Sequence, residues 1–445
     1  MKKIFLVALA TIVVGGLIFS GCAAPPAPPS GPEEIVVGCS APLTGMFGSI
    51  GESHSYGMRA AVDDINKQGG IYVKEYGRKL PVKLIVVDNE SDPIKSGSLA
   101  EDLILRDKVR FLITQSMPLP VHECNLADQY KVPNIVGAGP LEPWLGMREG
   151  VTPHWPYTWF TGFAIAIPPP PGDFRHGEPG YTILDTWKGM LDKFGDQTNK
   201  KVGVFALDDP DGIGWYGLFP KALGEWGYDV IGTEEELGLF PRGTTDFTPI
   251  IKEWKDNDVE ILWGNCSGPD FGTLWRQCHT LGFKPKVVFV ARAALEYADV
   301  NAWGGDLANG IGTELKWDPS LEGCPGIGDT TPQSLWERWR EETGRPLSRG
   351  IAESGYRPMQ VLFDAIERAG TLDGDAVNKA IGETDMVTID HRVKFDPDTH
   401  FSWGPLFFGQ WQKTDKPWVW ECPVVFSNHD FVPVTAEPVF PVPYD

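Results

Sequence analysis

Buried strands alternate with amphipathic helices along most of this chain, and the alternation limits the folds that it can adopt. Apolar runs such as VKLIVVD (82–88) and VRFLIT (109–114) are typical of strands covered on both faces. Between them, residues 93–106 place two leucines and an isoleucine on one helical face. Strands separated by helices of this length predict βαβ units and a parallel sheet.

The same pattern begins again after residues 139–180, a stretch rich in proline and tryptophan. A second set of buried strands is predicted at KVGVFAL (201–207), VEILWG (259–264) and KVVFVA (286–291). Two βα series of similar size predict an α/β protein with two Rossmann-like lobes, each on a parallel sheet. Later the alternation loosens into helices at 333–342 and 350–369, and into β hairpins from Arg392 onward.

The N-terminus has the layout of an export signal. Lys2 and Lys3 precede an uncharged apolar run, and Ser20 and Gly21 stand directly before Cys22. A cationic start, a short apolar core and small residues at the end are typical of a secretory signal peptide, and the run is short for a membrane span. Residues 1–21 are therefore expected to be removed on export.

A small pair followed by cysteine also resembles the bacterial lipobox, in which the cysteine becomes the lipidated first residue. Phe19 departs from that motif, which usually has leucine there. The Ala/Pro-rich residues 22–33 suit a flexible tether. We expect Cys22 to anchor the protein to a membrane facing the periplasm or the cell exterior, and a signal that is simply cleaved is the alternative.

The net charge and the cysteine positions argue against several classes of binding partner. A formal net charge of −21 argues against nucleic acid and against adhesion to an anionic membrane surface, because both depend on clustered lysine and arginine. The cysteines beyond Cys22 are far apart, without zinc-finger spacing, and Cys266 and Cys278 are the nearest pair for a disulfide. The sequence predicts no metal and no cofactor.

The first predicted strand and helix carry a family resemblance. IVVGCSAPLTGMFGSIGESHSYGMRAAVDDINKQGGI (35–71) contains A-P-L-T-G, a glycine six residues later, and a helix ending in D-D-I-N-x-x-G-G-I. This stretch closely resembles the solute-binding proteins of branched-chain amino-acid ABC transporters. VVDNESDPIKS (86–96), LILRDKVRFLIT (103–114) and VKFDPDTH (393–400) support the resemblance.

The resemblance implies the type I periplasmic-binding fold, in which two α/β lobes joined by three crossing strands close over a small ligand. It also implies a membrane ABC permease as partner and no catalytic activity, and we expect a monomer. The implied crossings lie at 157–162, 291–295 and 385–390. The implied lobes are 33–159 plus 294–387 and 160–292 plus 388–445.

Ligands of parallel sheets bind beyond the carboxyl ends of the strands, so the loops there supply the predicted ligand site. The candidate ligand-binding residues are Thr44, Met46, Phe47, Ile50, Ser116, Met117, Gly139, Leu141, Ile213, Trp215, Asn265, Cys266 and Arg292. For several of these, packing is the alternative role: an inter-lobe salt bridge for Arg292, the core for Ile50 and Met117, and helix packing for Trp215.

The resemblance also bears on the ligand. Amino-acid binders of this family use hydroxyl side chains in two loops and an acidic residue after the second hinge strand, but this chain has Pro118, Leu141 and Ala293 there. A buried ammonium group without an acceptor costs several kcal/mol. We therefore predict an apolar or aromatic carboxylate held by Arg292 rather than an ordinary α-amino acid; a branched-chain amino acid, an amide or urea is the alternative.

Two other classes of protein have some support in the sequence. GNCSG (264–268) resembles a cysteine form of the hydrolase nucleophile elbow, in which a helix N-terminus would lower the thiol pKa of Cys266. Asp390, His391 and His400 follow it, but none is distinctively placed, so a ligand-rim loop is the favoured interpretation. The same two-lobed fold also serves as a sensor module, although no signalling segment is present. DDPDG (208–212) lacks the closing glutamate of a calcium loop.

Overall fold

The computed structural model describes residues 31–115, 120–137, 139–151, 153–233, 237–346 and 348–444 of the 445-residue chain. The predicted signal peptide, Cys22 and most of the tether lie outside these residues. Within the described ranges, none of the helices is both long and apolar enough to cross a membrane.

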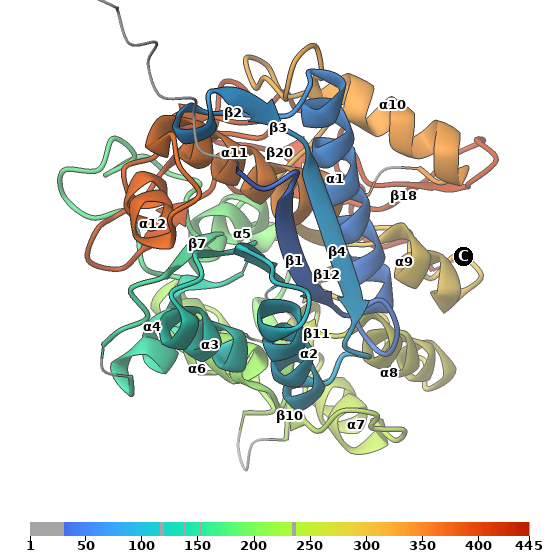
Figure 1. The fold of residues 1–445 in the computed structure, drawn as a ribbon. Helices are drawn as coiled ribbons and strands as arrows, with labels where there is room; N and C mark the ends of the chain where they lie inside the picture. Colours follow the sequence, from blue (N-terminus) through green and yellow to red (C-terminus); the bar gives the residue numbers. More distant parts are fainter. Residues whose placement is uncertain are drawn as a thin grey trace, which may run out of the picture.

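A six-stranded parallel sheet forms the centre of the first lobe, called lobe 1 (Figure 1). In sheet order its strands are β16 (Phe401–Trp403), β7 (Thr158–Gly162), β6 (Asn134–Val136), β5 (Phe111–Thr114), β1 (Ile35–Ala41) and β4 (Val82–Asp88). Its helices are α1 (Gly48–Lys67), α2 (Pro93–Leu105), α3 (Val121–Tyr130), α4 (Leu141–Glu149), α10 (Pro332–Thr343), α11 (Arg357–Ala369) and α12 (Gly374–Gly382). Local chemistry sets their ends: the Asp92 carboxylate accepts 2.8 Å hydrogen bonds from the Ile94 and Lys95 N–H groups and so starts α2.

An eight-stranded mixed sheet forms the centre of lobe 2. In sheet order its strands are β10 (Leu239–Phe240), β8 (Lys201–Leu207), β11 (Ile261–Cys266), β12 (Val287–Arg292), β13 (Ile311–Leu315), β17 (Phe407–Gln410) and β20 (Val424–Phe426), with β9 (Asp229–Ile231) also on β8. The strands up to β13 pair in parallel, and β17 pairs antiparallel with both β13 and β20. Its helices are α5 (Ile183–Leu191), α6 (Pro210–Glu225), α7 (Thr248–Asp256), α8 (Gly268–Thr280) and α9 (Tyr297–Trp303).

Small elements complete the molecule. They are the hairpins β2 (Ile71–Val73) with β3 (Arg78–Leu80), β14 (Asp385–Val387) with β15 (Arg392–Lys394), and β18 (Gln412–Lys413) with β19 (Trp420–Glu421), and the 3₁₀ turns η1 (Lys74–Tyr76) and η2 (Gly195–Gln197). The helix predicted over 350–369 has two parts, a π-helical turn η4 (Ile351–Tyr356) and then α11. A Cβ atom on Gly57 would lie 1.7 Å from the carbonyl oxygen of Ile351, so glycine allows α1 to pack directly on this turn.

Two of the predicted crossings between lobes lie too early in the chain. Because β13 pairs with β12, the chain stays in lobe 2 until Leu315 and not only to 292. Because β16 pairs with β7, the chain stays in lobe 1 until Trp403 and not only to 387. The crossing segments lie together: the Gly404 N–H donates to the Gly162 carbonyl at 2.7 Å.

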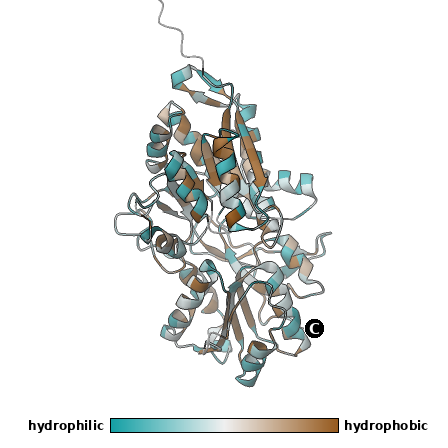
Figure 2. Cartoon of the chain, turned by 60° about the horizontal axis from the view of Figure 1, so that its bottom comes forward, coloured by the Kyte–Doolittle hydropathy of each residue, from teal (hydrophilic) through white to brown (hydrophobic). Residues whose placement is uncertain are grey.

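Apolar side chains fill both lobes. Figure 2 shows the two lobes one above the other, with hydrophobic strands inside and hydrophilic helix faces outside. Most of the large buried side chains are tryptophans, among them Trp144, Trp187 and Trp263. The cysteines at 39, 124, 266, 278, 324 and 422 are free buried thiols, so Cys266 and Cys278 form no disulfide.

A buried ion pair ties the segment before β15 to the start of α11. The Arg357 guanidinium donates to the Asp390 carboxylate, which also accepts from the Thr388 hydroxyl at 2.7 Å. Burial alone would raise the pKa of Asp390, but the charges of Arg357 and His391 bring it down to about 2. Arg357 also donates to the carbonyl of Thr161 in β7 at 3.4 Å, so the pair holds the crossing region together.

We predict that Asp390→Ala lowers the free energy of unfolding by about 3–5 kcal/mol, because it leaves a buried arginine without its partner. The matched control is Asp385→Ala in the same hairpin, whose ion pair with Arg392 is exposed and whose loss should cost less than about 1 kcal/mol. Urea denaturation of both variants measures the difference, and equal losses would contradict the prediction.

Candidate ligand-binding site

A small cavity lies between the lobes, where the carboxyl ends of strands from both sheets face each other. Its volume is about 20 Å³, so the two lobes nearly close over it. Lobe 1 contributes residues from α1 and η4, and lobe 2 contributes the ends of β11, β12 and β13 and the first turns of α6. The lining residues are Ile50, His54, Phe163, Asp211, Trp215, Asn265, Ala291, Arg292, Leu295, Glu314, Lys316, Glu353 and Ser354.

Arg292 is paired within its own lobe. Its Nη1 lies 2.9 Å from Asp209 Oδ2 and 3.4 Å from Asp211 Oδ2, and its Nη2 donates to Asp209 Oδ1 at 3.3 Å. Asp209 is in place because it caps α6 by accepting from the Gly212 N–H at 2.8 Å. Burial would lower the pKa of Arg292, but the charges of Asp209 and Asp211 raise it. The charge of Arg292 is therefore already balanced, by a salt bridge within lobe 2 rather than between lobes.

Asp211 joins three side chains of the cavity wall. Its carboxylate accepts from Trp215 Nε1 at 3.0 Å, one helical turn away, and from Asn265 Nδ2 at 3.2 Å. Burial raises the pKa of Asp211, and the neighbouring Asp209 charge adds to the rise. This group therefore holds a proton more readily than an exposed aspartate does.

The opposite wall carries a second ion pair. Lys316 Nζ lies 3.4 Å from Glu353 Oε2, across the lobe boundary, and 4.8 Å from the ring centre of Phe163. Burial raises the pKa of Glu314, two residues before Lys316, to about 7. Burial also lowers the pKa of His54 to about 3, so its imidazole is neutral at physiological pH.

Several polar atoms at this cavity have no hydrogen-bond partner among the described residues. They are His54 Nδ1, Asn265 Oδ1, Arg292 Nε and Glu353 Oε2. Buried polar atoms are rarely left unpaired in native proteins. The four atoms comprise one donor, two acceptors and an imidazole nitrogen that can serve as either, and all belong to residues that line the cavity.

Glu296 links the lobes beside the cavity. It precedes α9 in lobe 2, and its carboxyl group contacts the hydroxyls of Ser53 and Ser348 in lobe 1, the first at 3.0 Å. The Ser53 hydroxyl also lies 2.9 Å from the Ile50 carbonyl and has one proton to donate. Burial raises the pKa of Glu296 to about 8, so a protonated Glu296 can itself donate to Ser53.

The structure brings four of the predicted site residues to the cavity: Ile50, Trp215, Asn265 and Arg292. Phe47 lies beside them, with its ring centre 5.7 Å from the Arg292 guanidinium. Ser116 and Met117 lie outside the described residues.

The other predicted residues lie elsewhere. Thr44 is exposed and donates to Asp88, and Met46 packs on the core of lobe 1. The Gly139 carbonyl accepts from the Phe163 N–H at 3.0 Å, and Leu141 is fully buried beside Trp144. Cys266 is fully buried, and Ile213 is about half exposed on α6.

The sequence predicted Arg292 but none of the other charged residues that line the cavity. His54 and Asp211 could have been found, because each lies four positions from a predicted residue on the same helix, Ile50 or Trp215. Glu353 could not, because it depends on the π-helical turn η4. Acidic residues that the sequence did not indicate also line the cavity: Asp211, Glu314 and Glu353 come from other elements than the one that carries Ala293.

Cys266 does not have the environment of a nucleophile. Burial raises its thiol pKa well above the ordinary value, and the Asp270 charge raises it further, contrary to the predicted lowering by the helix N-terminus. Asp209 and Asp211 of DDPDG contact Arg292. Within the described ranges, no three His, Cys, Asp or Glu side chains are grouped to hold a metal ion.

Two α/β lobes with facing strand ends, three crossing segments and a cavity shared by both lobes define a two-lobed solute-binding protein. The sequence profile described as "Periplasmic binding protein" matches residues 34–416, and the chain belongs to this family. The predicted α/β fold class and the family resemblance are therefore confirmed. Membership implies an exported protein that works in the periplasm.

Similar proteins cover most of the chain. Leu/Ile/Val-binding protein homolog 3 of Brucella melitensis is 24% identical over 368 residues, covering 78% of this chain and 83% of that protein. Among solved structures, the leucine-binding protein LivK of Thermotoga maritima has a TM-score of 0.67 at 17% identity, covering 88% and 99% of the two chains. A solute-binding protein of an ABC transporter from Rhodopseudomonas palustris, in complex with 3,4-dihydroxybenzoic acid, has a TM-score of 0.65 at 19% identity, covering 91% and 99%.

We predict that stability falls as the pH rises from about 5 to 8, in part because Glu296 must lose a proton in the folded protein. A carboxyl whose pKa is raised by folding binds more protons in the folded state than in the unfolded state across this window. Glu296→Gln keeps an uncharged group at Ser53 and Ser348 and should reduce this dependence. Urea denaturation at several pH values measures it, with exposed Glu52→Gln as the control; an unchanged dependence in Glu296→Gln would refute the assignment.

Proposed function

We propose that this protein is the solute-binding component of an ABC importer. It captures a small solute in the cavity between the lobes and delivers it to a membrane permease. The family membership and the lining of the cavity by both lobes support this proposal. A ligand that contacts both lobes binds best when they are closed, so binding favours the closed arrangement.

The ligand that the cavity favours carries N–H donors, as an ammonium or an amide group does. The observation that carries this proposal is the charge balance: Asp211, Glu314 and Glu353 line the cavity, and its two cations already have acidic partners. A carboxylate ligand would have to compete with Asp209 and Asp211 for Arg292. An amine or amide would instead meet Asn265 Oδ1, which has no hydrogen-bond partner among the described residues, and the Glu353 carboxylate, which lies 3.4 Å from Lys316 Nζ.

We therefore favour an amino acid or an amide as the ligand over an aromatic or apolar carboxylate. Curated relatives carry names for leucine, isoleucine and valine binding, which agrees with an ammonium-bearing ligand with an apolar body. The structural neighbour with 3,4-dihydroxybenzoic acid speaks for a carboxylate, and Arg292 as its anchor stays a prediction. Ile50, Phe163 and Trp215 supply the apolar wall in either case.

A matched ligand series tests whether the cavity prefers a ligand with N–H donors or a carboxylate. Leucine, isopentylamine, isovaleramide and isovalerate share one branched body and differ in the polar end. We predict that the first three bind more tightly than isovalerate, measured by calorimetry on the mature protein. Tightest binding by isovalerate would overturn the proposal and support the carboxylate anchor at Arg292.

We also predict that Glu353→Gln weakens isopentylamine binding about 10-fold or more, because the ammonium loses a charged acceptor. Exposed Glu367→Gln on the following helix is the matched control and should leave the dissociation constant unchanged. An unchanged affinity in Glu353→Gln would remove Glu353 from the site.

We further propose that Cys22 is lipidated and that residues 22–33 tether the lobes near the permease. Cys22→Ser should move the exported protein from the membrane fraction to the soluble fraction after cell disruption. Equal membrane association of both proteins would show that the signal peptide is simply cleaved or that another segment anchors the chain.

A further inference from the structure

Phe47 of lobe 1 lies against two charged groups of lobe 2. Its ring centre is 5.5 Å from the guanidinium carbon of Arg242 and 5.7 Å from that of Arg292. Both distances are within the roughly 6 Å reach of a cation–π interaction. Phe47 is 2% exposed, yet it belongs to none of the apolar core clusters of the two lobes. Guanidinium groups of the other lobe therefore contribute to the burial of this ring.

The backbone around Phe47 is fixed to lobe 1. The Phe47 N–H donates to Ser91 Oγ at 3.2 Å, and the Phe47 carbonyl accepts from the Gly51 N–H at 2.9 Å in the first turn of α1. The Ser91 hydroxyl in turn donates to the Thr44 carbonyl at 2.7 Å. These bonds hold the loop between β1 and α1 against the loop after β4, so Phe47 moves with lobe 1.

One carboxylate of lobe 2 lies beside both guanidinium groups. Asp209 Oδ2 is 2.9 Å from Arg292 Nη1 and 3.6 Å from Arg242 Nη2. The Gly243 N–H donates to Asp270 Oδ1 at 3.1 Å, which fixes the loop of Arg242 to the start of α8. Arg292 has a φ of 64°, a left-handed conformation that residues other than glycine keep only where their surroundings hold them. Both cations are therefore positioned by groups of lobe 2.

These groups lie away from the segments where the chain crosses between the lobes. In lobe 1, β1 precedes Phe47 and is three strands from β7, whose end at Gly162 is a crossing. In lobe 2, β10 precedes Arg242 and is four strands from β13, whose end is another crossing. Neighbouring strands are about 4.8 Å apart, so the separations are roughly 14 Å and 19 Å. Rotation of the lobes about the crossing segments therefore moves Phe47 away from the arginines.

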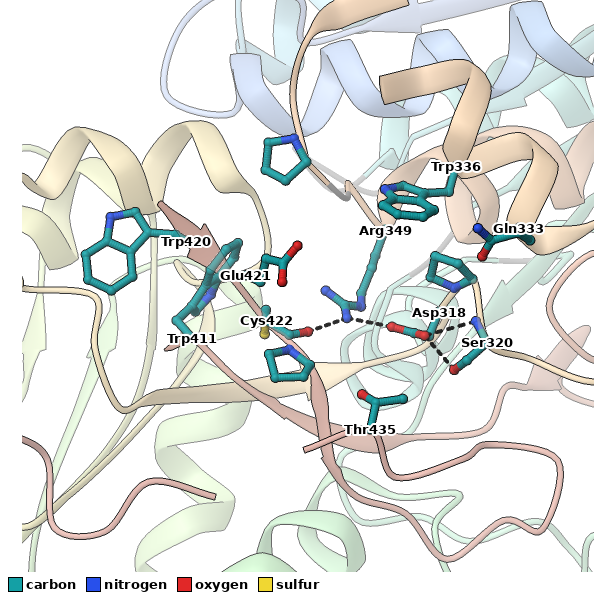
Figure 3. A pocket seen from close by; sticks show the side chains of 13 residues that line it. Asp318, Ser320, Gln333, Trp336, Arg349, Trp411, Trp420, Glu421, Cys422 and Thr435 are labelled. Carbon is teal, nitrogen blue, oxygen red and sulfur yellow. Dashed lines mark hydrogen bonds and ion pairs between the residues drawn. The ribbon is translucent and has the colours of Figure 1, made fainter. Parts of the chain in front are cut away.

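Other contacts tie the lobes beside the crossing. A second cavity, of about 320 Å³, lies there between α10 and the β18–β19 hairpin (Figure 3). On its wall, Arg349 of lobe 1 donates to the Cys422 carbonyl of lobe 2 at 2.6 Å and to Asp318, three residues after β13, at 2.8 Å. A rotation changes distances least near its axis, so these contacts can persist while the Phe47 contact is lost.

We propose that Phe47, Arg242 and Arg292 form a latch that holds the two lobes closed on the side away from the crossing segments. All three are side chains of the protein itself, so the latch stabilises the closed arrangement whether or not a solute is bound. The attraction is stronger for Arg292, which is 4% exposed, than for Arg242, which is 39% exposed, because water weakens a cation–π interaction.

The latch also bears on solute exchange, and this part rests on the proposed solute-binding function. Phe47 does not line the inter-lobe cavity, whereas Arg292 and Ile50, three residues after Phe47, do. A solute that is enclosed by both lobes leaves only when they separate. A contact that stabilises the closed lobes therefore slows the release of the solute.

Double electron–electron resonance measures the opening of the lobes without any solute. Nitroxides are attached at Ser98→Cys on α2 and Lys252→Cys on α7, both exposed, in the Cys22→Ser protein, whose other cysteines are buried. Phe47→Leu keeps an apolar side chain but removes the aromatic face. We expect it to raise the ratio of the long-distance to the short-distance population about fivefold. A distance distribution that Phe47→Leu leaves unchanged would overturn the proposal.

Arg242→Gln tests the latch from lobe 2 at an exposed position, where the substitution leaves the core intact. We expect the ratio to rise about threefold. The matched control Arg276→Gln, at an exposed arginine of α8 in the same lobe, removes the same charge and should leave the ratio unchanged. Arg242→Gln should have no further effect when it is combined with Phe47→Leu, because both remove one contact. A combined effect of about 15-fold would show two independent effects and would overturn the latch.

Stopped-flow kinetics tests the effect on solute exchange. We expect isopentylamine to dissociate about fivefold faster from the Phe47→Leu protein than from the wild type, because the lobes open more often. An unchanged dissociation rate would refute the role of the latch in exchange. Failure of isopentylamine to bind would instead count against the proposed ligand, and the distance measurement, which needs no solute, would still decide whether the latch exists.

Discussion

The parallel pairing of the strands is the constraint on which the site depends. Parallel strands run in one direction, so their carboxyl ends lie along one edge of the sheet and the following loops gather there. In this protein β11, β12 and β13 end at the edge of lobe 2 that faces lobe 1. The cavity exists because two such edges meet, and the crossing segments at Gly162 and Gly404 hold them in register.

Ion pairs decide what this edge can bind. An arginine at the end of a central strand suggests a carboxylate ligand, but α6 begins beside Arg292 with two aspartates that take its charge. Helix capping and ion pairing use the same side chain, since Asp209 both starts α6 and balances Arg292. Our proposal of a ligand with N–H donors rests on the carboxyl groups that line the cavity, whereas single loop positions had suggested a carboxylate ligand.

Local patterns predicted the elements well and their assignment to lobes less well. The strands at 82–88 and 201–207 were found from apolar runs, since a strand buried on both faces needs such a run. The lobe boundaries near 292 and 387 were misplaced, because strand pairing at β13 and β16 depends on partners more than 20 residues away. At the site, Ile50, Trp215, Asn265 and Arg292 follow from their positions at strand ends and helix starts. His54, Glu314, Lys316 and Glu353 do not, because their roles depend on which elements pack together.

The sequence by itself determined the fold class and the family, because these are written in local periodicity and contiguous motifs. Only the tertiary structure decided the charge balance of the site, because Arg292, Asp209, Lys316 and Glu353 meet across long separations in the chain. It also decided that both lobes enclose a second cavity, since its walls come from α10 and from a hairpin about 80 residues later in the sequence. Periodicity reports which side chains are buried, whereas packing sets which buried side chains face one another.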